Sequence, residues 1–175
     1  MNLQPATLKN ELIKLVPLNE SHWEEVYSAA SDPLIWAQHP APDRYKQDVF
    51  EKFFQEGIDS KGAFAIVDLK SAEIIGTSRF YDYDEKNRSI AIGYTFLVRK
   101  YWGTVYNKAL KSLMINYALE YVDEVIFHVG SINIRSQKAV EKLGARKYAE
   151  EMRAGKSYVY YRLEKANWIE KEADS

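Results

Sequence analysis

The chain has 175 residues, of which 46% are hydrophobic and 28% are charged, and its formal net charge is -1. This length suits one domain with a sizeable core and is short for two. The near-neutral charge gives no overall basic field of the kind that wraps nucleic acid, so any anion-binding site has to be local. The sequence has no cysteine, which excludes a disulfide framework, a thiolate metal site and a cysteine acyl-enzyme.

Targeting and membrane signals are absent from the sequence. The first ten residues lack an apolar signal core, and no uninterrupted apolar run approaches the roughly 18 residues of a membrane span. We therefore expect a cytoplasmic protein without a membrane partner, and a single domain over residues 1–175. Within it we expect a core at about 11–165 and a loose, acidic tail at 166–175.

The N-terminal part of the sequence predicts a strand, a helix and a loop. Residues 11–18 are rich in aliphatic side chains and end at Pro17, which is typical of a strand. Asn19 or Ser21 can cap the helix that follows. Residues 31–43 contain three prolines and no periodic pattern, which predicts a loop. The inner face of the helix is expected to hold Trp23, Val26, Tyr27 and Ala30.

The next segments predict a helix and an antiparallel meander. Residues 45–58 repeat phenylalanines in a way that favours a helix packed on a sheet. Residues 63–69 and 73–83 are strand-like, and Gly76 marks a bulge or a close backbone approach. The polar stretch 83–88 predicts a hairpin turn into the following strand.

Residues 90–120 change from a two-residue period to a helical one. Large apolar side chains alternate with small ones from Ile90 to Val98, which indicates a strand. A turn with Arg99, Lys100 and Gly103 follows, and a new helix then begins, whose free N–H groups form a ready anion site. The apolar stripe of this helix is predicted to be Tyr106, Leu110, Leu113, Met114, Tyr117 and Tyr121.

The C-terminal third predicts a strand, a helix and a hairpin. Residues 124–129 form a short apolar run, and residues 133–143 predict a helix that ends with Gly144 at its C′ position. Residues 145–152 and 157–164 predict a hairpin around Ala154 and Gly155.

Two motifs in this order resemble the GNAT N-acetyltransferase superfamily, most closely its ribosomal-protein N-acetyltransferase branch. The first is the turn R-x-Y-W-G at residues 99–103, and the second is the segment FHVGSINIRSQKAVEKLGA at residues 127–145 with its N-x-x-S and E-K-L-G elements. The resemblance implies an α+β fold of the α/β/α GNAT type. Its mixed, mostly antiparallel sheet of about seven strands has a V-shaped splay and is flanked by about four helices.

The resemblance also implies that acetyl-CoA is the co-substrate and that its pyrophosphate lies in the basic turn. The chain departs from the usual R-G-x-G-x-G/A run at Val105 and Asn107, although Asn107 can replace a small-residue contact with a side-chain hydrogen bond. Alternatively, the turn is a solvated helix start without a ligand, but two cations beside a helix N-terminus favour a bound anion. The cofactor-binding residues expected on this basis are Phe96, Leu97, Val98, Arg99, Lys100, Trp102, Gly103, Thr104, Val105, Tyr106, Asn107, Asn133 and Ser136.

The catalytic roles follow from the resemblance less directly. The family tyrosine that protonates the thiolate falls at Val140, so this role passes to Ser136, as in the branch that the chain resembles. Asn133 is expected to position CoA or, equally, to cap its helix. The family glutamate base falls at Ala91, which leaves His128, Tyr94 or an ordered water as the base. Alternatively, His128 is a structural residue, which is the commoner role of a lone histidine in a strand.

The missing carboxylate base bears on the acceptor. A lysine amine of pKa about 10.4 is roughly 0.1% neutral near pH 7.4, whereas an α-amine of pKa about 7.8 is roughly 30% neutral. A site without a strong base therefore suits an α-amine. In the family the loop segment lines the acceptor pocket, so Trp36 and His39 are candidate substrate contacts, although Trp36 can equally anchor the loop to the core.

The sequence thus predicts an N-acetyltransferase that moves an acetyl group from acetyl-CoA to a primary amine by direct attack. The acceptor is a protein N-terminus or a small-molecule amine, and no metal and no nucleic acid take part. Two alternatives are a catalytically silent CoA-binding regulatory module and an interaction domain without a nucleotide ligand. Whether the protein is a monomer or a homodimer stays open, because strand edges cannot be assigned from the sequence.

Overall fold

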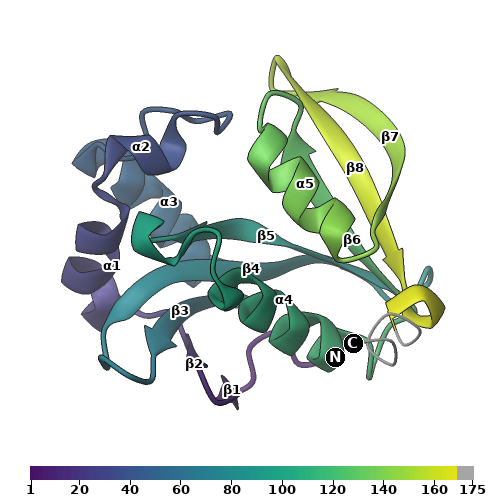
Figure 1. The fold of residues 1–175 in the computed structure, drawn as a ribbon, viewed down its shortest axis with the longest axis horizontal. Coiled ribbons are helices and arrows are strands. Elements are labelled where there is room, and N and C mark those ends of the chain that lie inside the picture. The colour runs from purple at the N-terminus through teal and green to yellow at the C-terminus, as the bar shows by residue number, and fades with distance from the viewer. Residues whose placement is uncertain (169–175) are drawn as a thin grey trace.

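A mixed eight-stranded sheet forms the centre of the molecule (Figure 1). The computed structural model describes residues 1–168. The strand order is β1-β2-β3-β4-β5-β6-β8-β7, and every neighbouring pair is antiparallel except β5 and β6. The strands are β1 Leu8–Lys9, β2 Ile13–Pro17, β3 Ala63–Asp68, β4 Ile74–Asp84, β5 Ser89–Leu97, β6 Glu124–Gly130, β7 Arg146–Arg153 and β8 Lys156–Glu164.

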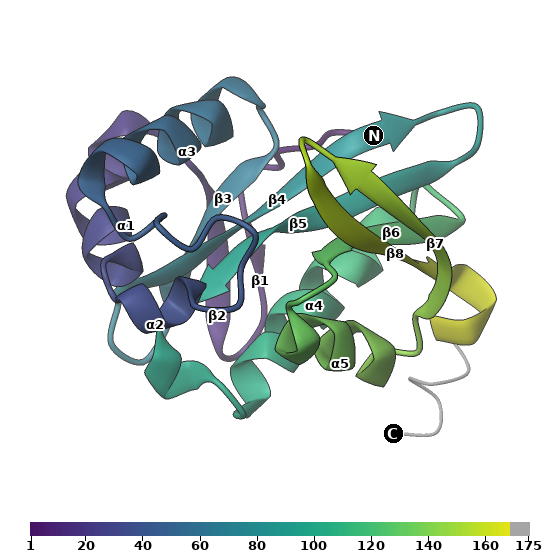
Figure 2. The ribbon, with the colours of Figure 1, turned by 90° about the horizontal axis from the view of Figure 1, so that it is seen from above.

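Helices cover the two faces of the sheet and bury two apolar clusters (Figure 2). The helices α1 Trp23–Ala30, α2 Pro33–Trp36 and α3 Gln47–Asp59 lie on one face, and their cluster includes Trp36, Phe50 and Phe96. The helices α4 Val105–Ala118 and α5 Ile134–Lys142 cover the other, where Leu110 and Phe127 are buried. Two 3-10 turns, η1 Glu20–His22 and η2 Arg99–Tyr101, precede α1 and α4.

This architecture confirms the predicted α+β fold class, with small differences in the elements. The sheet has one strand more than expected, because the two-residue β1 pairs with β2 through Leu8 and Leu15. The stretch 31–43 is not wholly a loop, since α2 begins inside it. Asp32 caps α2 by accepting a hydrogen bond from the Leu34 N–H at 3.0 Å, and Pro33 follows at the first helical position.

The buried face of α4 is rotated from the predicted stripe. Leu110 and Met114 are fully buried as expected, but Lys111 is also buried, and Tyr121 lies beyond the end of the helix with 40% of its surface exposed. The ammonium of Lys111 donates to the Thr95 hydroxyl at 2.9 Å. A lysine therefore lies on the face that apolar periodicity alone assigns to aromatic and aliphatic residues.

The pairing of β5 with β6 ends early and opens the sheet. Only Ser89, Ile90 and Ala91 of β5 pair with β6, although β5 continues to Leu97 and β6 continues to Gly130. Figure 1 shows β6, β8, β7 and α5 diverging as one arm from the arm that holds β3, β4 and β5. The V-shaped splay expected from the family resemblance is therefore present.

A bulge in β5 lies within this opening. Tyr94 has a φ of 51°, which is unusual for a residue other than glycine. The register with β4 shifts here, because Gly93 pairs with Arg79 but Phe96 pairs with Thr77. The extra residue turns the strand locally, as β-bulges do beside functional sites.

The start of the predicted tail is ordered rather than loose. Residues 165–168 are helical, and the buried Trp168 donates from its indole N–H to the Asn116 side-chain oxygen at 2.6 Å. The remainder of the tail, residues 169–175, lies outside the described residues.

Candidate active site

The edge of β5 that faces the opening carries unpaired backbone groups. The Val98 N–H donates to the Ile75 carbonyl at 2.9 Å, and the Phe96 carbonyl points at Gly76, so both groups face β4. Because successive residues of a strand face opposite sides, the Leu97 N–H faces the opening. The Leu97 carbonyl accepts from the Trp102 indole at 2.9 Å, which fixes the end of the strand. The predicted backbone contacts for the coenzyme at this end of the strand are Phe96, Leu97 and Val98. Of these three, Leu97 is the one whose N–H faces the opening.

The turn after β5 prepares the start of α4. Gly103 has a φ of +68°, which favours glycine, although a Cβ at this position would meet no atom within 4 Å. Thr104 caps α4 by accepting from the Tyr106 N–H, and its hydroxyl donates to the Tyr101 carbonyl at 2.6 Å. The N–H groups of Val105 and Asn107 have no partner within a helix, so they remain available to an anion.

The two cations of this turn are already paired with carboxylates. Arg99 donates to Asp32, the cap of α2, and Lys100 lies 3.9 Å from Glu73. They also precede the first residue of α4 by several positions. Their presence alone therefore does not require a bound anion, contrary to the argument from sequence.

A buried carboxylate holds this turn against the sheet. Asp68, at the end of β3, accepts from the hydroxyls of Tyr106 at 2.9 Å, Tyr101 at 3.2 Å and Ser71 at 2.9 Å, and from the Lys70 N–H at 3.3 Å. Burial raises the pKa of Asp68, but these hydrogen bonds outweigh it and hold the pKa below its usual value. Sequence reasoning missed this residue, because a strand-terminal aspartate has no distinguishing pattern.

A contact between the two arms crosses the opening in front of α4. The guanidinium of Arg135, in the first turn of α5, lies 3.5 Å from the centre of the Trp102 ring. Such close stacking of a cation on an indole is favourable. It brings a third cation beside the predicted anion site, one that no motif in the sequence marks.

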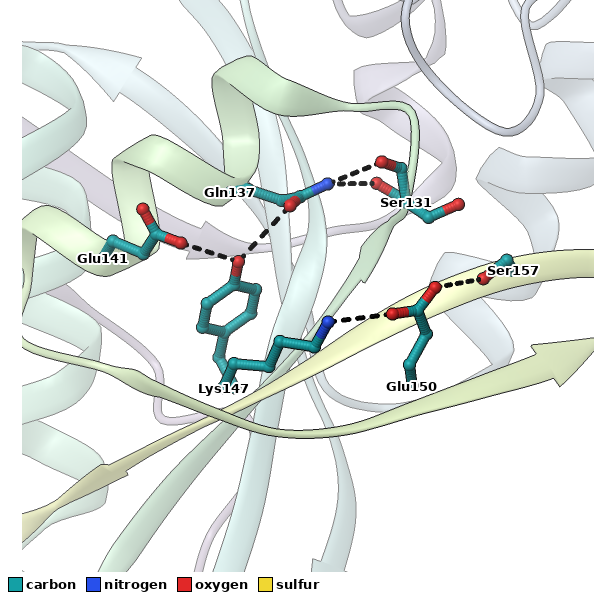
Figure 3. Close-up of polar contacts among 8 residues, drawn as sticks. Ser131, Gln137, Glu141, Lys147, Glu150 and Ser157 are labelled. Atoms are coloured by element: carbon teal, nitrogen blue, oxygen red, sulfur yellow. Dashed lines mark hydrogen bonds and ion pairs between the residues drawn. The ribbon is translucent and has the colours of Figure 1, made fainter.

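The start of α5 is built as a capped helix. The Asn133 side chain is buried and accepts from the Ser136 N–H at 3.3 Å, so the capping role expected for Asn133 is present. Figure 3 shows how Gln137 fastens this end of the helix, with its amide donating to the Ser131 carbonyl at 2.8 Å. It also donates to the Gly130 carbonyl at 3.2 Å. Ser136 is half-buried on the first turn of this anchored helix.

On the other side of the opening, Tyr81 joins two of the predicted catalytic residues. Its hydroxyl lies 2.9 Å from Nδ1 of His128, and its ring lies 5.0 Å from the ring of Tyr94. Burial and the nearby Arg153 hold the pKa of His128 below its usual value, so the imidazole is neutral near pH 7. Burial raises the pKa of Tyr81, so its hydroxyl keeps its proton. None of the contacts within residues 1–168 joins Ser136 to this group.

The hydrogen bonds of His128 assign its tautomer. A guanidinium can only donate, and Nη1 of Arg153 lies 3.3 Å from Nδ1 of His128. Nδ1 is therefore an acceptor whose single lone pair Arg153 and the Tyr81 hydroxyl share, and the proton of the neutral ring is on Nε2.

The segment 31–43, called the acceptor loop after its predicted role, packs across both arms. Trp36 is buried, its indole donates to the Ala30 carbonyl at 2.8 Å, and its ring lies 5.3 Å from Phe96. Trp36 thus anchors the loop to the core, the structural alternative of the two. Farther along, Pro40 lies against Gly130 of β6, and the Lys156 ammonium donates to the Pro40 carbonyl. The loop that begins after α1 therefore reaches the arm that holds β6 and β8.

Other features of the described residues lie outside this site. A cavity of about 950 Å³ opens near the other ends of β5 and β6, beside Ser89, Glu124 and Arg162. Within residues 1–168, no group of three or more histidines and carboxylates is arranged to hold a metal. The same residues contain no helix that combines the length and the apolar character needed to cross a membrane.

Comparisons with known proteins agree with this architecture. The family model of the acetyltransferase (GNAT) domain matches residues 13–146. A GCN5-related N-acetyltransferase from Brucella melitensis has a TM-score of 0.79 at 19% identity, over 95% of this chain and 83% of its own. A GNAT-family acetyltransferase from Bacillus anthracis has a TM-score of 0.74 at 17% identity, over 90% of this chain and 98% of its own.

A further similar structure contains ligands. It is the spermidine N-acetyltransferase from Vibrio cholerae in complex with CoA and spermine, with a TM-score of 0.67 at 14% identity, over 91% of this chain and 99% of its own. No curated protein matches the sequence. The family model spans well over half of the chain, and the chain is therefore a member of the GNAT acetyltransferase family and an acyltransferase.

Proposed function

We propose that this acyltransferase is an N-acetyltransferase that transfers the acetyl group of acetyl-CoA directly to a primary amine. The observation that carries the proposal is the early end of the β5–β6 pairing beside the start of α4. An extended chain can bond to the free edge of β5 there in the manner of an added strand. The pantetheine arm of CoA has the shape and the amide groups for this role.

The residues of the chain have separate roles in this proposal. The N–H groups of Val105 and Asn107 and the guanidinium of Arg135 bind the pyrophosphate. The Leu97 N–H, on the opening side of β5, hydrogen-bonds the thioester oxygen as negative charge develops on it. The Ser136 hydroxyl, on the fixed first turn of α5, donates to the departing thiolate. Attack by the amine needs no covalent enzyme intermediate.

The proposed chemistry uses no side-chain base. The proton of the neutral His128 ring is on Nε2, and Tyr81 and Arg153 engage the lone pair on Nδ1, so His128 is not used as a proton acceptor in this proposal. The amine therefore has to arrive neutral, and it loses its extra proton to water after attack. This favours an α-amine, such as that of an amino acid or a protein N-terminus, over a lysine side chain.

A structure assigned to a ribosomal-protein-serine acetyltransferase from Vibrio cholerae supports the protein N-terminus as one acceptor class. It has a TM-score of 0.72 at 14% identity, over 90% of this chain and 97% of its own. Its resemblance agrees with the R-x-Y-W-G turn of residues 99–103. Small α-amines satisfy the same chemical requirement.

Mass spectrometry of a panel of primary amines incubated with acetyl-CoA tests the proposal. We expect acetylated α-amines and a kcat/KM that rises with pH and levels off above about pH 8, following the neutral amine. Ser136→Ala should lower kcat about 10- to 100-fold without loss of CoA affinity, because the backbone N–H that Asn133 caps is kept. Ser131→Ala, one turn before α5, is the matched control and should be neutral.

The same experiment tests the rival function. Tight CoA binding by calorimetry, together with no acetylation of any amine, would identify a catalytically silent CoA-binding module. Absence of CoA binding at millimolar concentration would contradict both.

A further inference from the structure

The guanidinium groups of the buried Arg79 and the half-buried Arg44 lie around the ring of Phe53, on the face of the sheet that α1 to α3 cover. The guanidinium of Arg44 lies 4.5 Å from the centre of this ring and 5.4 Å from that of Trp36. The guanidinium of Arg79, on β4, lies 5.8 Å from the centre of the Phe53 ring and 4.0 Å from that of Tyr94. Arg79 is only 6% exposed, whereas Tyr94 beside it is 40% exposed.

Neither guanidinium is neutralised by the part of the chain that the structure describes. The ion pairs among residues 1–168 involve other side chains. The negative charge of Glu56 raises the pKa of both arginines, but its carboxylate lies beyond ion-pair distance of either. Nε of Arg79 is buried without a hydrogen-bond partner. A buried charge without a counter-charge is costly, and burial accordingly lowers the pKa of both arginines. Arg44 and Arg79 therefore lack a negatively charged partner among the described residues.

The neighbourhood of Arg44 shows where that charge would be bound. His39 accepts a hydrogen bond on Nδ1 from the Ala41 N–H at 2.9 Å, so its Nε2 carries the proton of the neutral ring. Burial and the nearby Arg44 lower the pKa of His39 to about 3, so this ring stays neutral. Nη1 of Arg44 lies 3.4 Å from Nε2 of His39, and both atoms are donors. Two adjacent donors without an acceptor between them form a binding site for an oxyanion.

Arg79 has a different part in this arrangement. The space beside it, lined by Phe53, Gly57 and Tyr94, has a volume of about 10 Å³, which suffices for about one water molecule and not for a ligand. A water there can bond to Nε. Arg79 therefore acts through its charge, beneath the exposed ring of Tyr94, while Arg44 and His39 are only half-buried and can make direct contacts.

We propose that the acceptor amine carries a carboxylate, which is bound by the guanidinium of Arg44 and by Nε2–H of His39. The inference rests on the proposed function, because the amine has to approach Leu97 from the side of Tyr94. Lys156, which holds the Pro40 carbonyl, adds a further positive charge to the same loop. A polyamine of the kind bound by the Vibrio cholerae enzyme would be repelled here, whereas an amino acid or a peptide with an acidic first residue would be attracted.

The test compares acceptors that differ only in the carboxylate. Peptide amides that begin with Asp or Glu are paired with those that begin with Asn or Gln, β-alanine is paired with its amide, and spermidine is added. Rates are corrected for the fraction of neutral amine. We expect kcat/KM to favour the carboxylate member of each pair at least tenfold, and spermidine to be the poorest acceptor. Comparison of the peptide pairs with the β-alanine pair distinguishes a peptide acceptor from a small-molecule acceptor.

Variants connect this preference to the residues. Arg44→Gln should reduce the preference to less than about twofold, Arg44→Lys should retain part of it, and both should bind CoA as the wild type does. Arg146→Gln, an exposed arginine on β7, is the matched control and should keep the full preference. Thermal melts confirm that each variant is folded.

Binding separates failure of this inference from failure of the proposed function. Calorimetry with CoA present should show N-acetyl-aspartate, a product analogue, binding to the wild type at least tenfold more tightly than to Arg44→Gln, whether or not turnover is seen. Turnover that favours amides or spermidine, or a preference that persists in Arg44→Gln, would overturn the inference and leave the acetyltransferase intact. Absence of any acetylation would contradict the proposed function, and equal affinity of N-acetyl-aspartate for both proteins would then contradict the inference as well.

Discussion

Lys111 illustrates how a single buried charge escapes a pattern-based analysis. The helical period around Leu110 and Met114 is real, and both residues are fully buried. Lys111 is adjacent to Leu110 on the same face, and its charged end reaches Thr95 of β5, whose hydroxyl lies 2.8 Å from that of Ser78. Nothing in the sequence indicates that a lysine among helix-forming residues ends in the sheet, because its partner is the Thr95 hydroxyl rather than an acidic residue at helical spacing.

Replacement of Lys111 by methionine should stabilise the protein at neutral pH. Burial lowers the pKa of Lys111 to about 8. A base whose pKa is depressed in the folded state lowers stability in full below the folded value, and stability recovers as the pH rises from about 8 towards the unfolded value of about 10.4. Lys111→Met should therefore raise the unfolding free energy at pH 7 by roughly 2 to 3 kcal/mol.

Urea denaturation at pH 7 and at about pH 9.5 measures both parts of this expectation. The wild type should gain stability between the two pH values relative to Lys111→Met. Lys108→Met, on the exposed face of the same helix, is the control and should change little. A less stable Lys111→Met at pH 7 would mean that the hydrogen bond to Thr95 outweighs the burial of the charge.

Asp68 is the residue on which the start of α4 depends. Asp68→Asn removes the charge that accepts from Tyr101 and Tyr106, and we expect a loss of about 1 to 3 kcal/mol of stability and a lower CoA affinity. Because the pKa of Asp68 is depressed in the folded state, its contribution is present above the unfolded value of about 3.9 and is lost as the pH falls through the folded value. Urea titration and calorimetry with CoA measure the two effects.

The control for Asp68 is Ser71→Ala. It removes one hydrogen bond to the carboxylate at 2.9 Å but leaves both tyrosines in place. Its stability should fall less than that of Asp68→Asn, and its CoA affinity should not change. Equal CoA affinities for Asp68→Asn and the wild type would show that the turn is held without this carboxylate.

At the scale of elements, periodic segments are predictable and short ones are not. The alternation in residues 90–98 and the apolar runs of β3 and β6 identify these strands directly. The four-residue α2 and the two-residue β1 are too short to show a period, and each depends on a local contact, the Asp32 cap in one and pairing with β2 in the other. The bulge at Tyr94 likewise follows from packing between strands rather than from residue type.

The contact between the acceptor loop and β6 gives a prediction at this scale. A Cβ on Gly130 would lie less than 3.0 Å from the Pro40 ring, so Gly130→Ala should push the loop outwards. We expect the KM for the amine to rise several-fold while CoA affinity is unchanged. Steady-state kinetics with both substrates measure this, and Ser131→Ala, which leaves the contact with Pro40 in place, is the control. An unchanged amine KM in Gly130→Ala would show that the loop position does not control acceptor binding.

Over the whole molecule, the opening between the arms was predictable but the placement of charge around it was not. The motifs at 99–103 and 127–145 identify the family and with it the splay. The net charge of -1 conceals an uneven distribution, with Arg44, Arg79 and Arg135 near the opening and most of the ion-paired carboxylates elsewhere. These arginines lie far apart in the sequence and come together only when the sheet and its helices pack.

Under the proposed function, the stacking of Arg135 on Trp102 gives the two substrates separate entrances. This contact spans the arms on the side of α4 and α5, so a coenzyme bound as proposed has to part it before reaching the edge of β5. An amine bound as proposed comes instead from beneath the loop around Pro40, on the side of α1 to α3. Neither molecule blocks the path of the other, so a ternary complex can assemble in either order, and the spent thiol can depart while the acetylated product is still bound.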